Sequence, residues 1–216
     1  MSKEIFLNAI NRFSGVKALV VGDIMLDVYE YCLTEHSKIL HSEKPGKRAY
    51  RPQKVLKALG GAGNVAANLA SLGVKTLLAG VAGNDGNYFK LRELCEENNI
   101  SHFIIRDFSR PTTVKTRLYI DDEYILRKDE ECSDKIDFKI LAELMKEISR
   151  AIQGASVVIL SDYNKGVFTE NLVREIIKEC RICSIPVVVD FKPANHVLFR
   201  GVADVIAPNE SEAKEL

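Results

Sequence analysis

The sequence predicts an α/β fold in which a parallel β-sheet lies between layers of helices. Short apolar runs at residues 157–160, 186–189 and 205–207 have the length and composition of strands, and residues 169–183 have helical spacing between the first two. Continuous apolar strands that alternate with helices are typical of parallel sheets covered on both faces. The 216 residues are enough to bury such a core.

The first half of the chain shows the same alternation around a glycine cluster. We expect a short amphipathic helix at residues 5–13 and a buried strand at residues 18–21, closed by Gly22 and Asp23. The cluster at residues 60–63 leads into a helix of small residues at 64–72. The later elements of this half are a buried strand, a turn and a helix, at residues 76–81, 83–86 and 88–98.

Two segments interrupt this alternation and predict a small β lid. Residues 28–58 are irregular, polar and aromatic, and they contain Pro45-Gly46 and Pro52, which suits a peripheral β segment. Residues 113–120 alternate and predict a hairpin with residues 124–128 across Asp121-Asp122. We expect segments 28–58 and 112–128 to pair as one lid on the α/β body.

The last elements suggest that the domain continues beyond this sequence. A strongly amphipathic helix is expected at residues 137–152. Residues 208–216 predict a turn and the beginning of a helix that is too short to be stable alone. We therefore expect residues 1–216 to be the N-terminal part of a domain whose sheet is incomplete at the C-terminus.

Composition excludes several classes of function. Basic and acidic residues balance at 30 each, so no electrostatic field favours binding to nucleic acid or to membranes. No apolar stretch approaches the roughly 20 residues that span a bilayer, and the first residues do not resemble a signal peptide. The five cysteines predict no disulfide framework, and we interpret Cys180 and Cys183 as core residues. These features predict a soluble cytoplasmic protein.

Polar side chains follow the predicted parallel strands where each strand ends. Ligands of open parallel sheets bind beyond the carboxyl ends of the strands. A mixture of carboxylates, amides and lysines at that edge suits sugar hydroxyls, phosphate and Mg²⁺. The residues expected there are Asp23, Asp27, Ser161, Asp162, Lys165, Asp190, Lys192, Asn209 and Glu212.

Structural roles are an alternative for several of these residues. Asn209 and Glu212 have the spacing of a capping box, and they can cap a helix as well as bind a ligand. Asp162 and Asp190 can simply terminate strands. We expect Asp85 to serve a turn or a helix cap.

The glycine cluster allows two interpretations. Residues 61–66 fit the Gly-x-Gly-x-x-Ala pattern of dinucleotide-binding proteins, but the preceding residues 52–59 are only weakly strand-like and no acidic residue follows at the required distance. The favoured interpretation is that glycine backbone and Asn64, at a helix N-terminus, approach a polyhydroxyl ligand closely. The chain contains no P-loop sequence.

The predicted hairpin carries basic residues that suit a phosphorylated ligand. Lys115 and Arg117 alternate onto one strand face, and Arg127 lies on the partner strand. A solvated strand face is the alternative. The four histidines have no spacing that indicates a site, and no Ser/His/Asp or Cys/His arrangement stands out.

Seven segments, taken in chain order, carry a resemblance to a known family. They are residues 21–27, 60–73, 111–117, 126–129, 160–166, 187–192 and 208–212. Together they resemble ribokinase or pfkB-type sugar kinases, and most of all the heptose 7-phosphate kinases that supply ADP-heptose to lipopolysaccharide. The resemblance implies a ribokinase-like fold and transfer of the ATP γ-phosphoryl group, with Mg²⁺, to a sugar hydroxyl. In a heptose 7-phosphate kinase that hydroxyl is anomeric, and the product is the 1,7-bisphosphate.

The resemblance also implies roles for residues of this chain. Asp27, Gly60, Gly61 and Asn64 would bind the sugar, while Lys115, Arg117 and Arg127 would contact the sugar phosphate from the lid. Asp190 and Lys192 would lie near the ATP phosphates, and Asn209 and Glu212 would help to hold Mg²⁺ indirectly. A homodimer formed through the lid is also compatible with the resemblance.

The chain departs from the family pattern in ways that affect function. It lacks the Gly-Ala-Gly-Asp motif whose glycines form the anion hole and whose Asp is the general base. We expect that base beyond residue 216, so no catalytic residue is assigned within the chain. Phe191 stands where heptose kinases usually have Pro, and the region after Tyr31 differs as well. The alternative function is a non-catalytic remnant or a sugar-phosphate-binding module.

Overall fold

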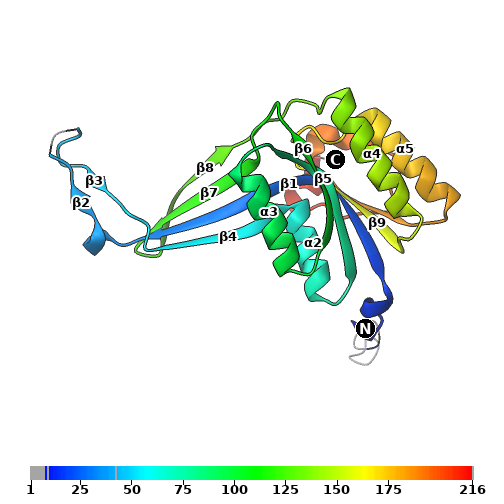
Figure 1. The fold of residues 1–216 in the computed structure, drawn as a ribbon, viewed down its shortest axis with the longest axis horizontal. Helices are drawn as coiled ribbons and strands as arrows, with labels where there is room; N and C mark the ends of the chain where they lie inside the picture. The colour runs from blue at the N-terminus through cyan, green and yellow to red at the C-terminus, as the bar shows by residue number, and fades with distance from the viewer. Residues whose placement is uncertain (1–7, 9, 42, 216) are drawn as a thin grey trace.

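Six parallel strands form the central sheet of the protein (Figure 1), in a computed structural model that describes residues 8, 10–41 and 43–215. The strands are β1 (Lys17–Cys32), β5 (Lys75–Gly83), β6 (Ser101–Asp107), β9 (Val157–Ser161), β10 (Val187–Asp190) and β11 (Val205–Ile206). Their order across the sheet is β11-β10-β9-β1-β5-β6, and every neighbouring pair is parallel. The α/β class predicted from the apolar runs is confirmed.

Helices cover both faces of this sheet (Figure 1). Helices α2 (Ala62–Ser71) and α3 (Gly86–Glu97) pack on one face, and α4 (Phe138–Ile152) and α5 (Glu170–Ile182) pack on the other. Each layer buries a separate core, since Leu91 of α3 belongs to one cluster and Leu144 of α4 to the other. The short helical segments are η1 (Phe13–Gly15), η2 (Thr34–His36), η3 (Pro193–Asn195), α6 (His196–Phe199) and α7 (Glu210–Glu215). Among the described residues, no helix is both long and apolar enough to cross a membrane.

The outer half of β1 takes part in a second sheet, the outer sheet. It consists of residues 25–32 of β1 with β4 (Lys54–Gly61), β7 (Thr113–Ile120) and β8 (Glu123–Glu130). Strand β1 lies between antiparallel β4 and parallel β7. Residues 28–32 of β1 belong to the first predicted lid segment and pair with residues 116–120 of β7 in the second, so the two segments pair directly. The outer sheet projects from the body, and a hairpin of β2 (Lys38–Ile39) and β3 (Arg48–Ala49) lies at its far end (Figure 1).

Residues 28–58, predicted as a peripheral β segment, form strand at both ends, and these strands are longer and more regular than the composition indicates. Strand β1 runs without interruption to Cys32, and β4 begins at Lys54. Val28 and Cys32 are buried and lie on the same face of β1, since side chains alternate along a strand, and β4 and β7 pair with β1 on its two sides. Of the predicted N-terminal helix at 5–13, residues 5–7 and 9 lie outside the described residues.

Strand β6 was not predicted from the sequence. Only Phe103, Ile104 and Ile105 are apolar within it, and polar residues occupy both ends. The strand is stabilised by its ladder with β5 and by the burial of Ile104 and Ile105, which are contacts distant in sequence. It forms one edge of the central sheet, where a short apolar run suffices.

The two cysteines near the end of α5 have different environments. Cys180 packs in the core as predicted, and burial raises the pKa of its thiol to about 11. Cys183 is exposed just past the helix end, so the prediction that it packs in the core is wrong.

A close contact between β1 and β9 brings the carboxyl ends of the two strands together. A Cβ atom on Gly22 would lie 2.0 Å from the backbone oxygen of Ser161, a separation that no side chain tolerates. Gly22 therefore allows the strands to approach, and Asp23 and Asp162 leave the sheet next to each other.

Candidate functional site

Asp27 lies where β1 leaves the central sheet for the outer sheet. Its Oδ1 accepts a hydrogen bond of 2.8 Å from Nη1 of Arg117 on β7, and both side chains are partly exposed. The Arg117 guanidinium also lies over the ring of Tyr29, 5.1 Å from its centroid. This ion pair fixes the orientation of the Asp27 carboxylate, whose Oδ2 can then accept a hydrogen bond from a hydroxyl group.

Gly60 and Gly61 place bare backbone beside Asp27. A Cβ on Gly60 would lie 2.7 Å from Oδ2 of Asp27, and one on Gly61 would lie 2.3 Å from the backbone oxygen of Asp23. The left-handed φ of 56° at Gly61 also favours glycine. A strand, β4, does precede this cluster, contrary to prediction, but it is antiparallel and mostly exposed. It is therefore not the buried parallel strand that a dinucleotide fold requires.

A network of charged side chains continues from Asp27 across β7 and β8. Lys115 Nζ donates to Asp129 at 2.8 Å and to Glu131 Oε2 at 3.0 Å, and Arg127 Nε lies 2.8 Å from Asp129. Lys165, in the loop after β9, donates to the other oxygen of Glu131 at 2.8 Å. Burial raises the pKa of Asp129, but the hydrogen bonds and charges of Lys115 and Arg127 outweigh it and hold that pKa below its usual value.

Asp23 holds the loop that follows β9. Its carboxylate accepts hydrogen bonds from the backbone N–H groups of Tyr163 at 2.7 Å, Lys165 at 3.0 Å and Val167 at 3.4 Å. Burial is the main reason that the pKa of Asp23 rises to about 6, and the neighbouring carboxylate of Asp162 adds to it, although the backbone hydrogen bonds oppose the rise. The side chain therefore positions the loop and is shielded from solvent.

A second cluster lies at the carboxyl ends of β10 and β11. Lys192 Nζ donates to Glu212 Oε1 at 2.6 Å. The Asn209 N–H donates to Glu212 Oε2 at 3.0 Å, and the Glu212 N–H donates to Asn209 Oδ1 at 2.9 Å. The capping box is thus present, and the same carboxylate also pairs with a lysine, so the two interpretations of these residues are compatible. Burial, followed by the charge of Glu212, raises the pKa of Asp190.

Tyr163 lies near both clusters, and sequence reasoning did not identify it. The Lys192 ammonium lies 5.3 Å from its ring centroid, and the charges of Asp27 and Asp190 both act on its phenol. Glu131 was also missed, because it follows β8 of the outer sheet and not a strand of the central parallel sheet, and because its partners are distant in sequence. Asn64 is exposed, and its Oδ1 is 3.4 Å from Asn68 Nδ2 on the next turn of α2. No hydrogen bond in the described structure joins Asn64 to Asp27.

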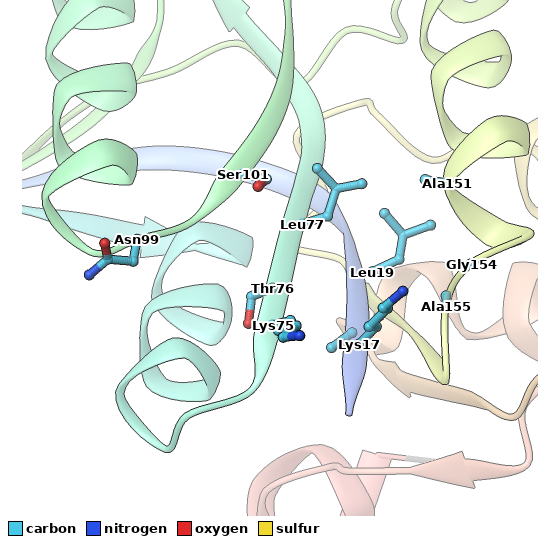
Figure 2. Close-up of a pocket in the computed structure, with 11 residues that line it drawn as sticks. Lys17, Leu19, Lys75, Thr76, Leu77, Asn99, Ser101, Ala151, Gly154 and Ala155 are labelled. Carbon is cyan, nitrogen blue, oxygen red and sulfur yellow. The ribbon is translucent and has the colours of Figure 1, made fainter. Parts of the chain in front are cut away.

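A separate cavity of about 430 Å³ lies away from these clusters (Figure 2). It opens near the amino ends of β1 and β5, between Lys17, Lys75 and the C-terminal end of α4. None of the predicted site residues lines it, and no carboxylate lies among its lining residues. Because ligands of parallel sheets bind at the carboxyl ends of strands, we place the functional site at Asp27 and not in this cavity.

The family model for pfkB family carbohydrate kinases matches residues 17–216. The chain belongs to the pfkB family. This membership confirms the resemblance drawn from the seven segments and classifies the chain with the phosphotransferases that act on carbohydrates.

Relatives within the pfkB family include several much longer proteins. The bifunctional protein HldE of Campylobacter curvus is 33% identical over 93% of this chain, and that of Bradyrhizobium sp. strain ORS 278 is 38% identical over 91%. These matches cover 42% and 40% of the respective relatives. The chain therefore spans about two fifths of the length of the curated relatives that it matches.

Solved structures of pfkB-type kinases share the fold. A carbohydrate kinase from Agrobacterium tumefaciens superimposes with a TM-score of 0.67 at 19% identity, covering 93% of this chain and 63% of that chain. The tetrameric inhibited form of phosphofructokinase-2 from Escherichia coli gives 0.70 at 15% identity, with the same coverage. At these identities the likeness establishes the ribokinase-like architecture alone.

The pfkB family implies ATP and Mg²⁺, and the second cluster suits them only in part. Within residues 8, 10–41 and 43–215, no three His, Cys, Asp or Glu side chains gather in a way that would hold a metal ion. Both oxygens of Glu212 are already engaged, by Lys192 and by the Asn209 N–H. The donor set therefore fits a magnesium ion held through water and not by direct protein ligation.

Proposed function

We propose that this chain provides the sugar-binding part of a carbohydrate kinase that acts on heptose 7-phosphate. Transfer of the ATP γ-phosphoryl group to the anomeric hydroxyl would give heptose 1,7-bisphosphate. The observation that carries the proposal is the Asp27 carboxylate, oriented by Arg117 and placed against the bare backbone of Gly60. A carboxylate beside open backbone suits a polyhydroxyl ligand, which needs both hydrogen-bond acceptors and close approach.

Charge supports a phosphorylated sugar as the ligand. Lys115, Arg117 and Arg127 share one face of the outer sheet, as the ladder pairs Arg117 with Arg127 and Lys115 with Asp129. Lysine and arginine bind phosphate through charge-assisted hydrogen bonds. The matches to HldE proteins over more than nine tenths of the chain favour heptose over other sugars of the family.

The second cluster would face the nucleotide. In this proposal Lys192 and Asp190 lie near the phosphates of ATP, while Asn209 and Glu212 orient the water shell of Mg²⁺. The bound ion would neutralise charge on the phosphates, which is its usual contribution to phosphoryl transfer. Lys192 supplies a cation at the same place, and its contact with Glu212 keeps the ammonium protonated and oriented.

Calorimetric titration of the 216-residue chain with heptose 7-phosphate tests the sugar site. We expect saturable binding that is lost, by tenfold or more (about 1.4 kcal/mol), in Asp27→Asn. The matched control is Asp122→Asn, which removes a carboxylate from the exposed turn between β7 and β8. Equal affinity in wild type and Asp27→Asn would contradict the proposed sugar site.

A binding module without catalysis is the second candidate, and the absence of a Gly-Ala-Gly-Asp sequence favours it for these residues alone. Both candidates predict sugar-phosphate binding. They differ in whether a longer protein that contains these residues transfers the phosphoryl group.

A further inference from the structure

Glu131 bridges two lysines that come from separate parts of the fold. Lys115 lies on β7, whereas Lys165 lies in the loop between β9 and α5. The two Glu131 oxygens accept from them at 3.0 Å and 2.8 Å respectively. The lysine side chains are only 13% and 17% exposed, so each depends on a nearby anion to remain charged at low cost.

The bridge lies next to the proposed sugar site. Lys115 is the residue of β7 that is paired with Asp27 in the ladder with β1. The backbone N–H of Lys165 is bound by Asp23, so the position of this lysine is fixed by the same strand that carries Asp27. An anion held between the two ammonium groups would thus lie close to a sugar bound at Asp27.

Glu131 can leave this position without disrupting the sheet. Strand β8 ends at Glu130, and residues 131–137 form a connector with no regular secondary structure before α4. The connector is held further along, where the backbone oxygen of Asp134 accepts from Arg110 Nη2 at 2.9 Å and the Ile136 N–H donates to the backbone oxygen of Gly166 at 3.1 Å. Rotation of the Glu131 side chain therefore breaks two ion pairs but no ladder pair of β7 and β8.

We propose that Lys165 and Lys115 bind the phosphate group of the acceptor sugar, and that Glu131 is an internal anion which this phosphate displaces. The inference rests on the proposed function and adds Lys165 and Glu131 to its sugar-phosphate site. A phosphate monoester carries about −1.5 to −2 charges near pH 7, so it competes well with the single charge of Glu131 for Lys165 and for Lys115, which also donates to Asp129 at 2.8 Å. An unphosphorylated sugar cannot displace Glu131, and the exchange therefore selects for phosphorylated acceptors.

The nearly isosteric replacement Glu131→Gln is the decisive variant. It keeps the size of the side chain but removes the competing charge, so we expect inorganic phosphate and heptose 7-phosphate to bind on the order of tenfold more tightly than to wild type, or about 1.4 kcal/mol. Unphosphorylated heptose should bind equally to both proteins. The matched control is Glu130→Gln, which removes the adjacent exposed carboxylate that pairs with Lys128 at 2.5 Å.

Lys165→Gln tests the other half of the exchange. This variant should weaken the binding of inorganic phosphate and of heptose 7-phosphate. In the double variant Glu131→Gln with Lys165→Gln, the increase in phosphate affinity caused by Glu131→Gln should largely disappear, because the two side chains act on one another. The backbone bond from Lys165 to Asp23 is retained in the variant, and thermal melting checks that each protein is folded. ADP affinity should not change, which separates a sugar-phosphate role from a nucleotide role.

Several outcomes would overturn the inference. Phosphate affinity that is unchanged or weaker in Glu131→Gln would show that Glu131 is a structural partner of the lysines, even if wild type binds heptose 7-phosphate and the proposed function stands. If Glu131→Gln bound ADP more tightly than wild type, but not heptose 7-phosphate, the inference would also be refuted. If heptose 7-phosphate does not bind, but Glu131→Gln still binds inorganic phosphate tenfold more tightly than wild type, the displacement of Glu131 by phosphate is supported and the assignment of heptose as the sugar is refuted.

Discussion

Asp23 is the residue with the most unusual ionisation in the site. Burial and the adjacent Asp162 raise its pKa from the usual 3.8 to about 6 in the folded protein. Between those values the unfolded chain releases its proton while the folded protein retains it, so the contribution of Asp23 to the unfolding free energy decreases as pH rises. Over about two pH units this amounts to roughly 3 kcal/mol.

The Asp23→Asn variant makes this contribution measurable. We expect the difference in unfolding free energy, wild type minus variant, to fall by roughly 3 kcal/mol between about pH 3 and pH 7 and to level off above about pH 7. Urea unfolding at several pH values measures it, with Asp122→Asn as the control for loss of an exposed carboxylate. A difference that rises with pH would contradict the raised pKa.

Residue roles were predictable where the sequence marks a strand end or a repeated motif. Lys192 and Glu212 follow apolar runs, and the structure brings their side chains together, whereas Asp27 lies within β1 and not at its end. Glu131 and Tyr163 also follow strands, β8 and β9, but their contacts with residues distant in the chain leave no signal in the local sequence. The ligand roles of all these residues remain predictions.

Helix caps are the element-scale feature that the sequence located best. Asp85 accepts hydrogen bonds from the N–H groups of Asn87 at 2.9 Å and Tyr88 at 3.2 Å, and so caps α3 as expected. It also accepts from the N–H and the hydroxyl of Thr112, at 2.8 Å and 2.9 Å, which ties the helix to the start of β7. The pairing with Thr112 was not foreseeable from local sequence.

This double role makes Asp85 more important to stability than an ordinary cap. We expect Asp85→Ala to lower the unfolding free energy by about 2–3 kcal/mol, as the cap and two further hydrogen bonds are lost. The control is Asp137→Ala, which removes only the cap of α4, at Lys139 and Ile140, and should cost about 1 kcal/mol. Equal losses in urea unfolding would mean that the Thr112 contacts contribute nothing.

Helices and strands were predicted well where burial produces a pattern of apolar residues in the local sequence. They were predicted poorly where pairing with distant strands determines the structure. The amphipathic spacing of α4 and α5 and the apolar runs of β9 and β10 specify these elements within one or two residues. In contrast, the extension of β1 to Cys32 and the whole of β6 depend on ladders with other strands. Such pairing is a tertiary property that overrides weak local preference.

On the scale of the whole molecule, we expect these 216 residues to bind the sugar without catalysing phosphoryl transfer. Phosphoryl transfer requires a base that takes the proton of the acceptor hydroxyl. Asp23 and Asp27 are already engaged, by three backbone N–H groups and by Arg117 respectively. The sequence has no Gly-Ala-Gly-Asp motif to supply another base. A protein of these 216 residues alone should therefore bind heptose 7-phosphate without phosphorylating it.

ADP release in the presence of ATP, Mg²⁺ and heptose 7-phosphate measures this directly. We expect no sugar-dependent ADP formation from the 216-residue chain at concentrations where calorimetry shows the sugar site to be occupied. Fusion to the Gly-Ala-Gly-Asp segment of a longer pfkB relative should restore transfer, and Asp27→Asn in that fusion should abolish it. Sustained turnover by the 216-residue chain, lost in Asp27→Asn, would instead mean that a side chain within these residues acts as the base.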